Sequence, residues 1–329
     1  MSTLTTLKAA TVQFQHQAGN KQYNLLMMEK FIQQAALQQV KILTFPEMCI
    51  TGYWHVTRLA ASEVSALAEA VETSPSLALI RSLAIKHQML IGAGLIERAE
   101  DGRLYNAYVA CMPDGTIHTH RKLHAFEHPA IGSGERFTVF DTPWGVKVGI
   151  LICWDNNLVE NVRATALLGA DILLAPHQTG GTQSLSPCGM KPIPLELWEQ
   201  RETRQQEITA AFKGPNGRGW LMRWLPARAH DNGLFILFSN GVGADEEEVR
   251  SGNAMILDPY GRIIDETWAA GDAMVSAELD LTLLAMSTGR RWIHGRRPEL
   301  YGILTEMQGY ERDARSARFS QEIPQKKIR

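Results

Sequence analysis

Apolar residues follow two patterns along this chain, and the two patterns alternate. Short apolar runs, such as those within residues 41–45 and 171–175, are typical of strands buried in a sheet. Between such runs, apolar residues recur three and four positions apart, as in residues 20–39, which is typical of an amphipathic helix. This order of strands and helices predicts an α/β layered fold with mixed sheets.

Two successive hairpins are predicted in the first half of the chain. A turn at residues 101–102 separates the strands 89–96 and 104–112, and a second turn at residues 113–115 precedes a strand at 116–122. Strands connected in this way are expected to pair with their sequence neighbours.

A cysteine lies where a predicted strand meets a predicted helix. The apolar residues 148–152 predict a buried strand, and from Leu158 onward apolar residues recur every four positions. Asn157 and Glu160 resemble a capping box with Asn in the Ser/Thr position. The positive end of a helix favours a thiolate, which is the nucleophilic form of cysteine, so Cys153 is a candidate nucleophile. The alternative is a buried structural cysteine at a strand end.

Two other predicted strands also end in charged residues. Glu47 follows the strand 41–45 and Pro46, and Lys122 ends the strand 116–122. Binding and catalytic sites in α/β sheets are usually found where strands end, so both residues are candidate site residues. The alternative for Glu47 is a purely structural role. Several polar residues surround Lys122 and could form a metal site, but the Lys and Arg in the stretch favour a solvated strand end and loop. The polar residues are His118, His120, Arg121, His124, Glu127 and His128.

Composition narrows the class of protein. The chain has 329 residues, of which 45% are hydrophobic and 21% charged, and a net charge of -2, as in soluble globular proteins. It has no basic patch that would predict nucleic-acid binding, no apolar stretch of the ~18 residues that a membrane helix needs, and no signal-peptide pattern. Its four cysteines form no C-x-x-C pair, so we expect a reducing cytoplasm and no disulfide framework.

Several well-known motifs are missing from the sequence. It has no phosphate-binding loop, no G-x-G-x-x-G at a strand-to-helix turn, no H-E-x-x-H and no G-x-S-x-G. We therefore predict no cofactor and no metal.

The order of several short blocks resembles the carbon–nitrogen hydrolase (nitrilase) superfamily from about residue 7 to residue 301. Each block is weak alone, whereas all of them in this order are highly specific. The main blocks are Phe45-Pro46-Glu47 with Thr51-Gly52-Tyr53, Arg121-Lys122-Leu123-His124, and the stretch from Gly149 to Asp155. The supporting blocks are residues 228–232, 258–261 and 296–301.

The resemblance implies a four-layer α-β-β-α sandwich and a Glu–Lys–Cys triad, here Glu47, Lys122 and Cys153. Glu127 matches the second glutamate of many members, because it lies seven residues before Gly134. The resemblance also implies a homodimer or a larger homo-oligomer. The predicted organisation is one domain over residues 1–305 with a long insertion at about 178–219, followed by a polar C-terminal tail at 306–329.

The implied activity is hydrolysis of a small amide or N-carbamoyl compound through a cysteine thioester, with release of ammonia. A nitrilase, a soluble acyltransferase and an inactive binding protein are the alternatives. Cys-Trp-Asp stands here where true nitrilases usually have Cys-Trp-Glu, which favours an amide or carbamoyl substrate.

Several residues are candidates for contacting the substrate. They are Trp154, whose backbone N–H would also hold the oxyanion, Asn156, Asn157, His177 and Tyr53. Relatives that hydrolyse N-carbamoyl amino acids often have arginines soon after the nucleophile, where this chain has the two asparagines. A substrate carboxylate could instead be held by an arginine of the 178–219 insertion, namely Arg201, Arg204 or Arg218. We expect the insertion to be a lid; the alternative is a surface or dimer-contact excursion.

Overall fold

The computed structural model describes residues 4–181, 183–184 and 186–320. Its strands form one hydrogen-bonded network in the order β5-β4-β3-β2-β1-β10-β9-β8-β7, with β6, β11, β12, β13 and β14 attached at the sides. The strands are β1 (Thr6–Phe14), β2 (Ile42–Thr44), β3 (Leu90–Arg98), β4 (Leu104–Cys111), β5 (Ile117–Arg121), β6 (Ile131–Gly132), β7 (Thr138–Asp141), β8 (Lys147–Ile150), β9 (Ile172–His177), β10 (Phe235–Asp245), β11 (Glu248–Ser251), β12 (Met255–Leu257), β13 (Ile263–Glu266) and β14 (Ala273–Asp280).

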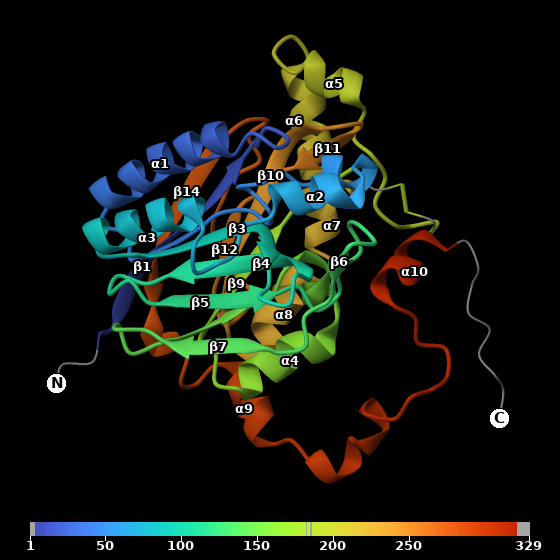
Figure 1. The fold of residues 1–329 in the computed structure, drawn as a ribbon. Helices are drawn as coiled ribbons and strands as arrows, with labels where there is room; N and C mark the ends of the chain where they lie inside the picture. The colour runs from blue at the N-terminus through green and yellow to red at the C-terminus, as the bar shows by residue number, and fades with distance from the viewer. Residues whose placement is uncertain (1–3, 182, 185, 321–329) are drawn as a thin grey trace.

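Helices cover both outer faces of this network (Figure 1). They are α1 (Lys21–Leu37), α2 (Ala61–Leu67), α3 (Pro75–His87), α4 (Val159–Leu167), α5 (Leu195–Glu199), α6 (Gln205–Lys213), α7 (Arg218–Leu221), α8 (Leu225–Asn232), α9 (Thr288–His294) and α10 (Ala314–Phe319). Short 3-10 turns are η1 (Trp54–Arg58), η2 (Cys153–Asn157), η3 (Leu281–Leu283), η4 (Pro298–Leu300) and η5 (Gly302–Leu304).

The network folds into two halves that pack face to face. On β9, Ile172 and Leu174 point into the core between the halves, whereas Leu173 and Ala175 pack under the helices α4 and α8. Strand β1 alternates in the same way between the central core and the core beneath α1 and α3. Alternate residues of one strand therefore serve two cores, because successive side chains point to opposite faces. The predicted α-β-β-α sandwich is confirmed.

The structure confirms the predicted hairpins but not the predicted start of the helix after Cys153. Strands β3, β4 and β5 pair antiparallel with their sequence neighbours, as the hairpins predicted. The helix after Cys153, however, begins only at Val159, with Leu158 as its N-cap and no side-chain capping bond, so the predicted capping box of Asn157 and Glu160 is wrong. The 3-10 turn η2 occupies the residues in between.

The insertion at 178–219 consists of two structurally different parts. Its first part, up to residue 194, has no helix in the part that the structure describes. Its second part contains α5, α6 and the start of α7, and Leu197, Trp198, Ile208 and Phe212 pack there against Val242 and Val249 of β10 and β11. Of these helices, α5 projects beyond one end of the strands, whereas α7 lies within the body of the protein (Figure 1).

The segment predicted as a polar tail returns to the body of the protein. Residues 295–313 run outside the layers before the chain comes back at α10 (Figure 1). Ala314, the first residue of α10, is buried in a cluster with Tyr53, Trp54 and Phe126. The described part of this segment therefore ends on the domain surface and is more than a solvated tail. None of the described helices is long and apolar enough to span a bilayer.

The position of Glu47 depends on a glycine in the adjacent strand. A Cβ atom added to Gly94 of β3 would lie 2.3 Å from the backbone nitrogen of Met48 and 3.0 Å from the carbonyl carbon of Glu47. Backbone atoms cannot move aside as a flexible side chain can. A side chain at this position must therefore displace the turn that carries Glu47.

We expect Gly94→Ala to lower the free energy of unfolding by about 1–3 kcal/mol, as overpacking of a core typically does. Urea unfolding would measure this change. Gly271→Ala is the matched control, because a Cβ there meets no atom within 4 Å. Equal unfolding midpoints for the two variants would contradict the prediction.

Candidate active site

Three of the predicted residues meet in a buried charged cluster. Lys122, directly after β5, lies between Glu47, which follows β2, and Glu127 of the next loop. Its Nζ donates a hydrogen bond of 2.7 Å to Oε1 of Glu47 and another to Oε1 of Glu127. All three side chains are fully buried. The alternative of a solvated loop is therefore wrong for Lys122 and Glu127, because their charges are buried and paired.

Asn106 is part of this cluster and was not predicted. It lies on β4 and its Nδ2 donates to Oε1 of Glu47 at 2.7 Å and to Oε1 of Glu127 at 3.1 Å. A single Asn in the otherwise apolar run of β4 is the signal that could have identified it, because buried polar groups need partners. Tyr53 adds a longer contact of 3.5 Å from its hydroxyl to Glu127.

Burial raises the pKa of Glu47 well above its usual range, and the nearby Cys153 and Glu127 add to this effect. The attraction of Lys122 only partly offsets it. Oε1 of Glu47 accepts two hydrogen bonds, whereas Oε2 has no partner among the described residues. Glu47 is thus a buried carboxyl with one oxygen available to carry a proton.

Lys122 and Glu127 form the ionised pair of the cluster. Burial alone would lower the pKa of Lys122, but the charges of Glu127, Glu47 and Cys153 outweigh it and hold this pKa above its usual range. Burial would raise the pKa of Glu127, yet the charge and hydrogen bond of Lys122 lower it. Two carboxylates near one lysine are thereby driven apart in pKa, which is typical of acid–base sites.

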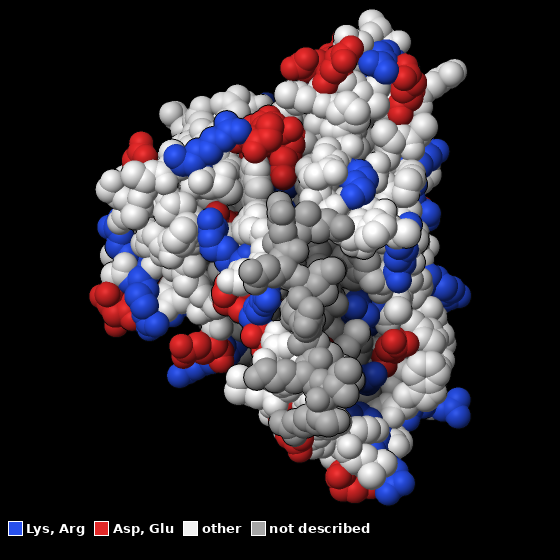
Figure 2. Space-filling model, turned by 90° about the vertical axis from the view of Figure 1, so that its right-hand side faces the viewer, with Lys and Arg blue, Asp and Glu red and all other residues white. Residues whose placement is uncertain are grey.

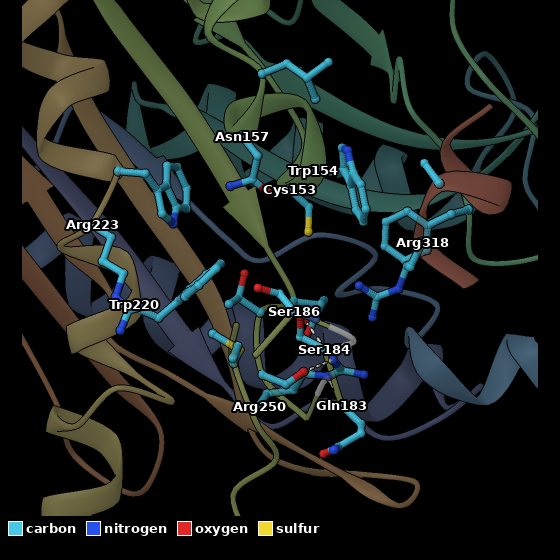
Figure 3. A pocket seen from close by; sticks show the side chains of 18 of the residues that line it. Cys153, Trp154, Asn157, Gln183, Ser184, Ser186, Trp220, Arg223, Arg250 and Arg318 are labelled. Carbon is cyan, nitrogen blue, oxygen red and sulfur yellow. Dashed lines mark hydrogen bonds between the residues drawn. The ribbon is translucent and has the colours of Figure 1, made fainter. Parts of the chain in front are cut away.

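Cys153 stands at a strained turn after β8. Its φ of +50° lies in the left-handed region, which is uncommon for a residue other than glycine. The side chain is partly exposed and points into a cavity (Figure 3). The predicted direct strand-to-helix junction at Cys153 is wrong, because Cys153 begins the 3-10 turn η2 and the helix α4 starts only at Val159.

Asp155 connects the cysteine turn to the lysine loop. Its buried carboxylate accepts hydrogen bonds from the backbone nitrogens of Leu123 (3.1 Å) and His124 (2.9 Å), and from Ile152 at 3.3 Å. Burial would raise its pKa, but the side chains of His120 and His124 outweigh this and hold the pKa far below the usual range. Residues next to Lys122 and Cys153 are therefore held by one carboxylate.

The cavity at Cys153 has a volume of about 630 Å³, within the range of small-molecule sites. Of the predicted substrate contacts, Tyr53, Trp154 and Asn157 line it. Other described lining residues include Phe126, Gln178, Thr179, Ser184, Met190, Trp220, Trp224, Arg223, Arg250 and Arg318.

Three residues of the cavity wall contact the charged cluster directly. The Tyr53 hydroxyl reaches Glu127, and Nε2 of Gln178 donates to the backbone oxygen of Glu47 at 2.8 Å. The ring centre of Phe126 lies 4.3 Å from Nζ of Lys122. The cluster therefore lies immediately behind the wall that carries Cys153.

Asn156 and His177 lie behind this wall and do not line the cavity. Asn156 Nδ2 donates to the backbone oxygen of Leu151 at 2.8 Å, and the buried His177 ring packs on Trp224 and Phe238. Burial lowers the pKa of His177 to about 3, so the ring is neutral at physiological pH. In this geometry both residues shape the wall, and a direct contact of either with substrate stays a prediction.

The insertion arginines considered for a substrate carboxylate lie elsewhere. Arg201 stacks on Trp198, Arg204 pairs with Glu207, and Arg218 pairs with Glu266. The cavity instead receives Arg223, Arg250 and Arg318.

The histidines around Lys122, which were considered as metal ligands, contact other groups. His118 stacks on Phe140, and Nε2 of His128 faces the backbone oxygen of Leu59. Within residues 4–181, 183–184 and 186–320, no three His, Cys, Asp or Glu side chains are grouped as metal ligands would be.

Comparison with known proteins agrees with the site. Residues 8–286 match the family model described as carbon-nitrogen hydrolase. The chain belongs to the carbon–nitrogen hydrolase family. This confirms the family resemblance seen in the motifs and the prediction that the protein is an enzyme of this class.

Individual relatives refine the comparison. The chain is 30% identical over 307 residues to an (R)-stereoselective amidase of Pseudomonas sp., covering 91% of this chain and 95% of the relative. It is 29% identical to a citrullinase of Francisella tularensis, covering 91% and 98%. These matches support a carbon–nitrogen hydrolase of the amidase type.

A solved structure shares the fold. It is a variant of the amidase from Nesterenkonia sp. AN1, with a TM-score of 0.68, 19% identity and coverage of 90% of this chain and 95% of the other. That structure shows covalent addition of the acetamide moiety of fluoroacetamide at its active-site cysteine.

We expect Asp155→Asn to lower the free energy of unfolding by about 2–4 kcal/mol near pH 7, since the amide loses a buried, charge-assisted acceptor. The folded pKa of Asp155 is depressed, so its stabilisation is present above the unfolded value of about 3.9 and is lost as pH falls towards the folded value. Denaturant unfolding at several pH values would measure the difference between variant and unmodified protein.

Asp141→Asn is the control for Asp155→Asn, because the Asp141 side chain is 82% exposed and its partner Lys147 lies 3.5 Å away. A cost for Asp155→Asn no larger than that of the control at pH 7 would contradict the anchoring role.

Proposed function

We propose that the protein hydrolyses the carbon–nitrogen bond of a small amide or N-carbamoyl compound through a thioester on Cys153 and releases ammonia. The observation that carries this proposal is the buried Glu47–Lys122–Glu127 cluster directly behind the cavity wall that bears Cys153. A nucleophile, a proton carrier and a fixed cation are the groups that acyl transfer requires.

In the first half of the reaction, Glu47 takes the thiol proton of Cys153 while the sulfur attacks the carbonyl carbon. Lys122 and the backbone N–H of Trp154 stabilise the negative oxygen of the tetrahedral intermediate. Glu47 then returns the proton to the leaving nitrogen, the carbon–nitrogen bond breaks, and ammonia leaves a thioester behind. The free Oε2 of Glu47 supports this role.

In the second half, water attacks the thioester carbonyl. Glu47 accepts a proton from the water, the carbon–sulfur bond breaks, and the proton returns to the sulfur of Cys153. An acid is released and the free thiol is restored. Glu127 keeps Lys122 charged and in place throughout, as its low pKa and hydrogen bond support.

Ammonia and carbon dioxide release from primary amides, N-carbamoyl compounds and nitriles tests the proposal. We expect ammonia from an amide or a carbamoyl compound, with carbon dioxide in step only for the carbamoyl class, and no turnover by Cys153→Ala. Cys188→Ala is the matched control, because Cys188 is also a free cysteine but lies exposed.

The panel also separates the alternatives. Activity confined to nitriles would assign a nitrilase, and a rate that depends on an added amine or alcohol would assign an acyltransferase. Ammonia release that survives Cys153→Ala would refute the thioester mechanism.

Removal of Lys122 tests oxyanion stabilisation separately. We expect Lys122→Ala and the similar-volume variant Lys122→Met to lose at least about 100-fold in kcat, which is the typical cost of one oxyanion donor. Circular dichroism would show whether each variant is folded. Near-normal turnover by a folded variant would exclude this role for Lys122.

The pH profile of kcat/KM tests Glu47. Glu47 must be ionised to accept a proton, and its raised pKa moves ionisation to higher pH. We therefore expect activity to be lost on acidification at a pH well above the ordinary glutamate value of about 4.3, while the protein remains folded. Asn106→Ala removes a hydrogen-bond donor to the ionised Glu47 and should therefore raise the pH at which activity is lost. Full activity down to the ordinary value would contradict the assignment.

A further inference from the structure

The charged side chains among the described residues that line the cavity are all positive. Three arginines line it, Arg223, Arg250 and Arg318, and none of its described lining residues is acidic. Glu47 and Glu127 lie behind the wall, where Lys122 pairs with both. Outside the cavity, the visible part of one face carries side chains of both signs (Figure 2). The positive charge is therefore a property of the cavity.

Arg250 holds the wall. Its Nε donates to Asp245 at 2.9 Å, and its Nη1 lies 2.8 Å from Glu248 and donates to the backbone oxygens of Gln178 and Gly180. Two carboxylates balance its charge, and its side chain is only 2% exposed. Arg250 thus fixes the segment around Gln178 as part of the cavity wall.

Arg318 reaches the cavity from the C-terminal helix α10. The helix is fixed by the buried Ala314 and by Arg315, whose Nη1 donates to the backbone oxygen of Phe126 at 2.8 Å. The guanidinium carbon of Arg318 lies 4.5 Å from the ring centre of Phe126 and 5.9 Å from that of Trp154. Figure 3 shows Arg318 and Cys153 directed into the same cavity from different segments.

Arg223 lies across the cavity from Arg318 (Figure 3), beside Trp220, and its Nη1 donates to the backbone oxygen of Cys188. Between the two arginines, the indole rings of Trp154, Trp220 and Trp224 provide apolar wall. A guanidinium that packs by its face on aromatic rings still presents N–H groups at its edge, the geometry that binds a carboxylate by two hydrogen bonds.

We propose that the substrate carries an anionic group, a carboxylate, on the part of the molecule that stays attached to the carbonyl, and that Arg318 binds this group. The proposal rests on the amide-hydrolase function above. The reacting amide lies at Cys153, the connecting chain lies against the indole of Trp154, and the carboxylate faces Arg318. A cation in the same place would meet like charges.

Binding to the Cys153→Ala variant tests the proposal without turnover. Isothermal titration would compare monoamides of the dicarboxylic acids from malonic to adipic acid with alkanamides and ω-amino amides of the same chain lengths. We expect at least one carboxylate amide to bind about tenfold or more tightly than its neutral counterpart, and the cationic amides to bind most weakly.

Variants assign this preference to Arg318. In the Cys153→Ala background, we expect Arg318→Gln to reduce the preference to within about threefold, Arg318→Lys to retain part of it, and Arg223→Gln to reduce it less than Arg318→Gln. Arg201→Gln is the matched control, because it removes one positive charge outside the cavity. A merely structural role of Arg318 would weaken carboxylate and neutral amides equally.

The outcomes separate the two proposals. Equal binding of carboxylate and neutral amides, tighter binding of cationic amides, no measurable binding of any carboxylate amide, or equal loss for both classes in Arg318→Gln overturns the anionic substrate. Ammonia release from the unmodified protein, measured on the same compounds, tests the hydrolase function independently. Selective binding without ammonia release would refute that function and leave the anion site standing.

Discussion

The site depends on one buried lysine held between two buried carboxylates. Lys122 can compensate one negative charge fully, and burial makes a second one costly. Glu127 therefore stays ionised, while the pKa of Glu47 rises. The arrangement fixes the lysine as a cation and makes Glu47 the group that can gain or lose a proton. Two glutamates of the same chemistry thus acquire different properties from their surroundings alone.

The fold fixes the position of this cluster relative to Cys153 through a few backbone contacts. Asp155 binds the backbone on both sides, next to Lys122 and next to Cys153, so the two loops cannot shift independently. On the other side, Gly94 lets the turn of Glu47 approach β3 closely. The Asp in Cys-Trp-Asp is therefore a structural anchor of both loops.

The first part of the insertion and the helix α10 meet at the cavity. Residues that begin the insertion form part of its wall, and α10 adds Arg318 from more than a hundred residues away. The cavity's charge is therefore decided by segments outside the strand ends that carry the cluster. The strand ends that carry the cluster and the arginines that line the cavity therefore come from different parts of the sequence.

The sequence by itself determined the elements, the family and the strand ends that carry Glu47, Lys122 and Cys153, because apolar periodicity and motif order are local properties. Only the tertiary structure revealed Asn106, the anchor role of Asp155 and the arginines of the cavity. These side chains act on partners distant in sequence, and the single Asn in the apolar run of β4 does not by itself indicate which partners it meets. The capping prediction at Asn157 failed for the same reason: the buried carboxylate of Asp155 fixes η2, and the helix begins after it.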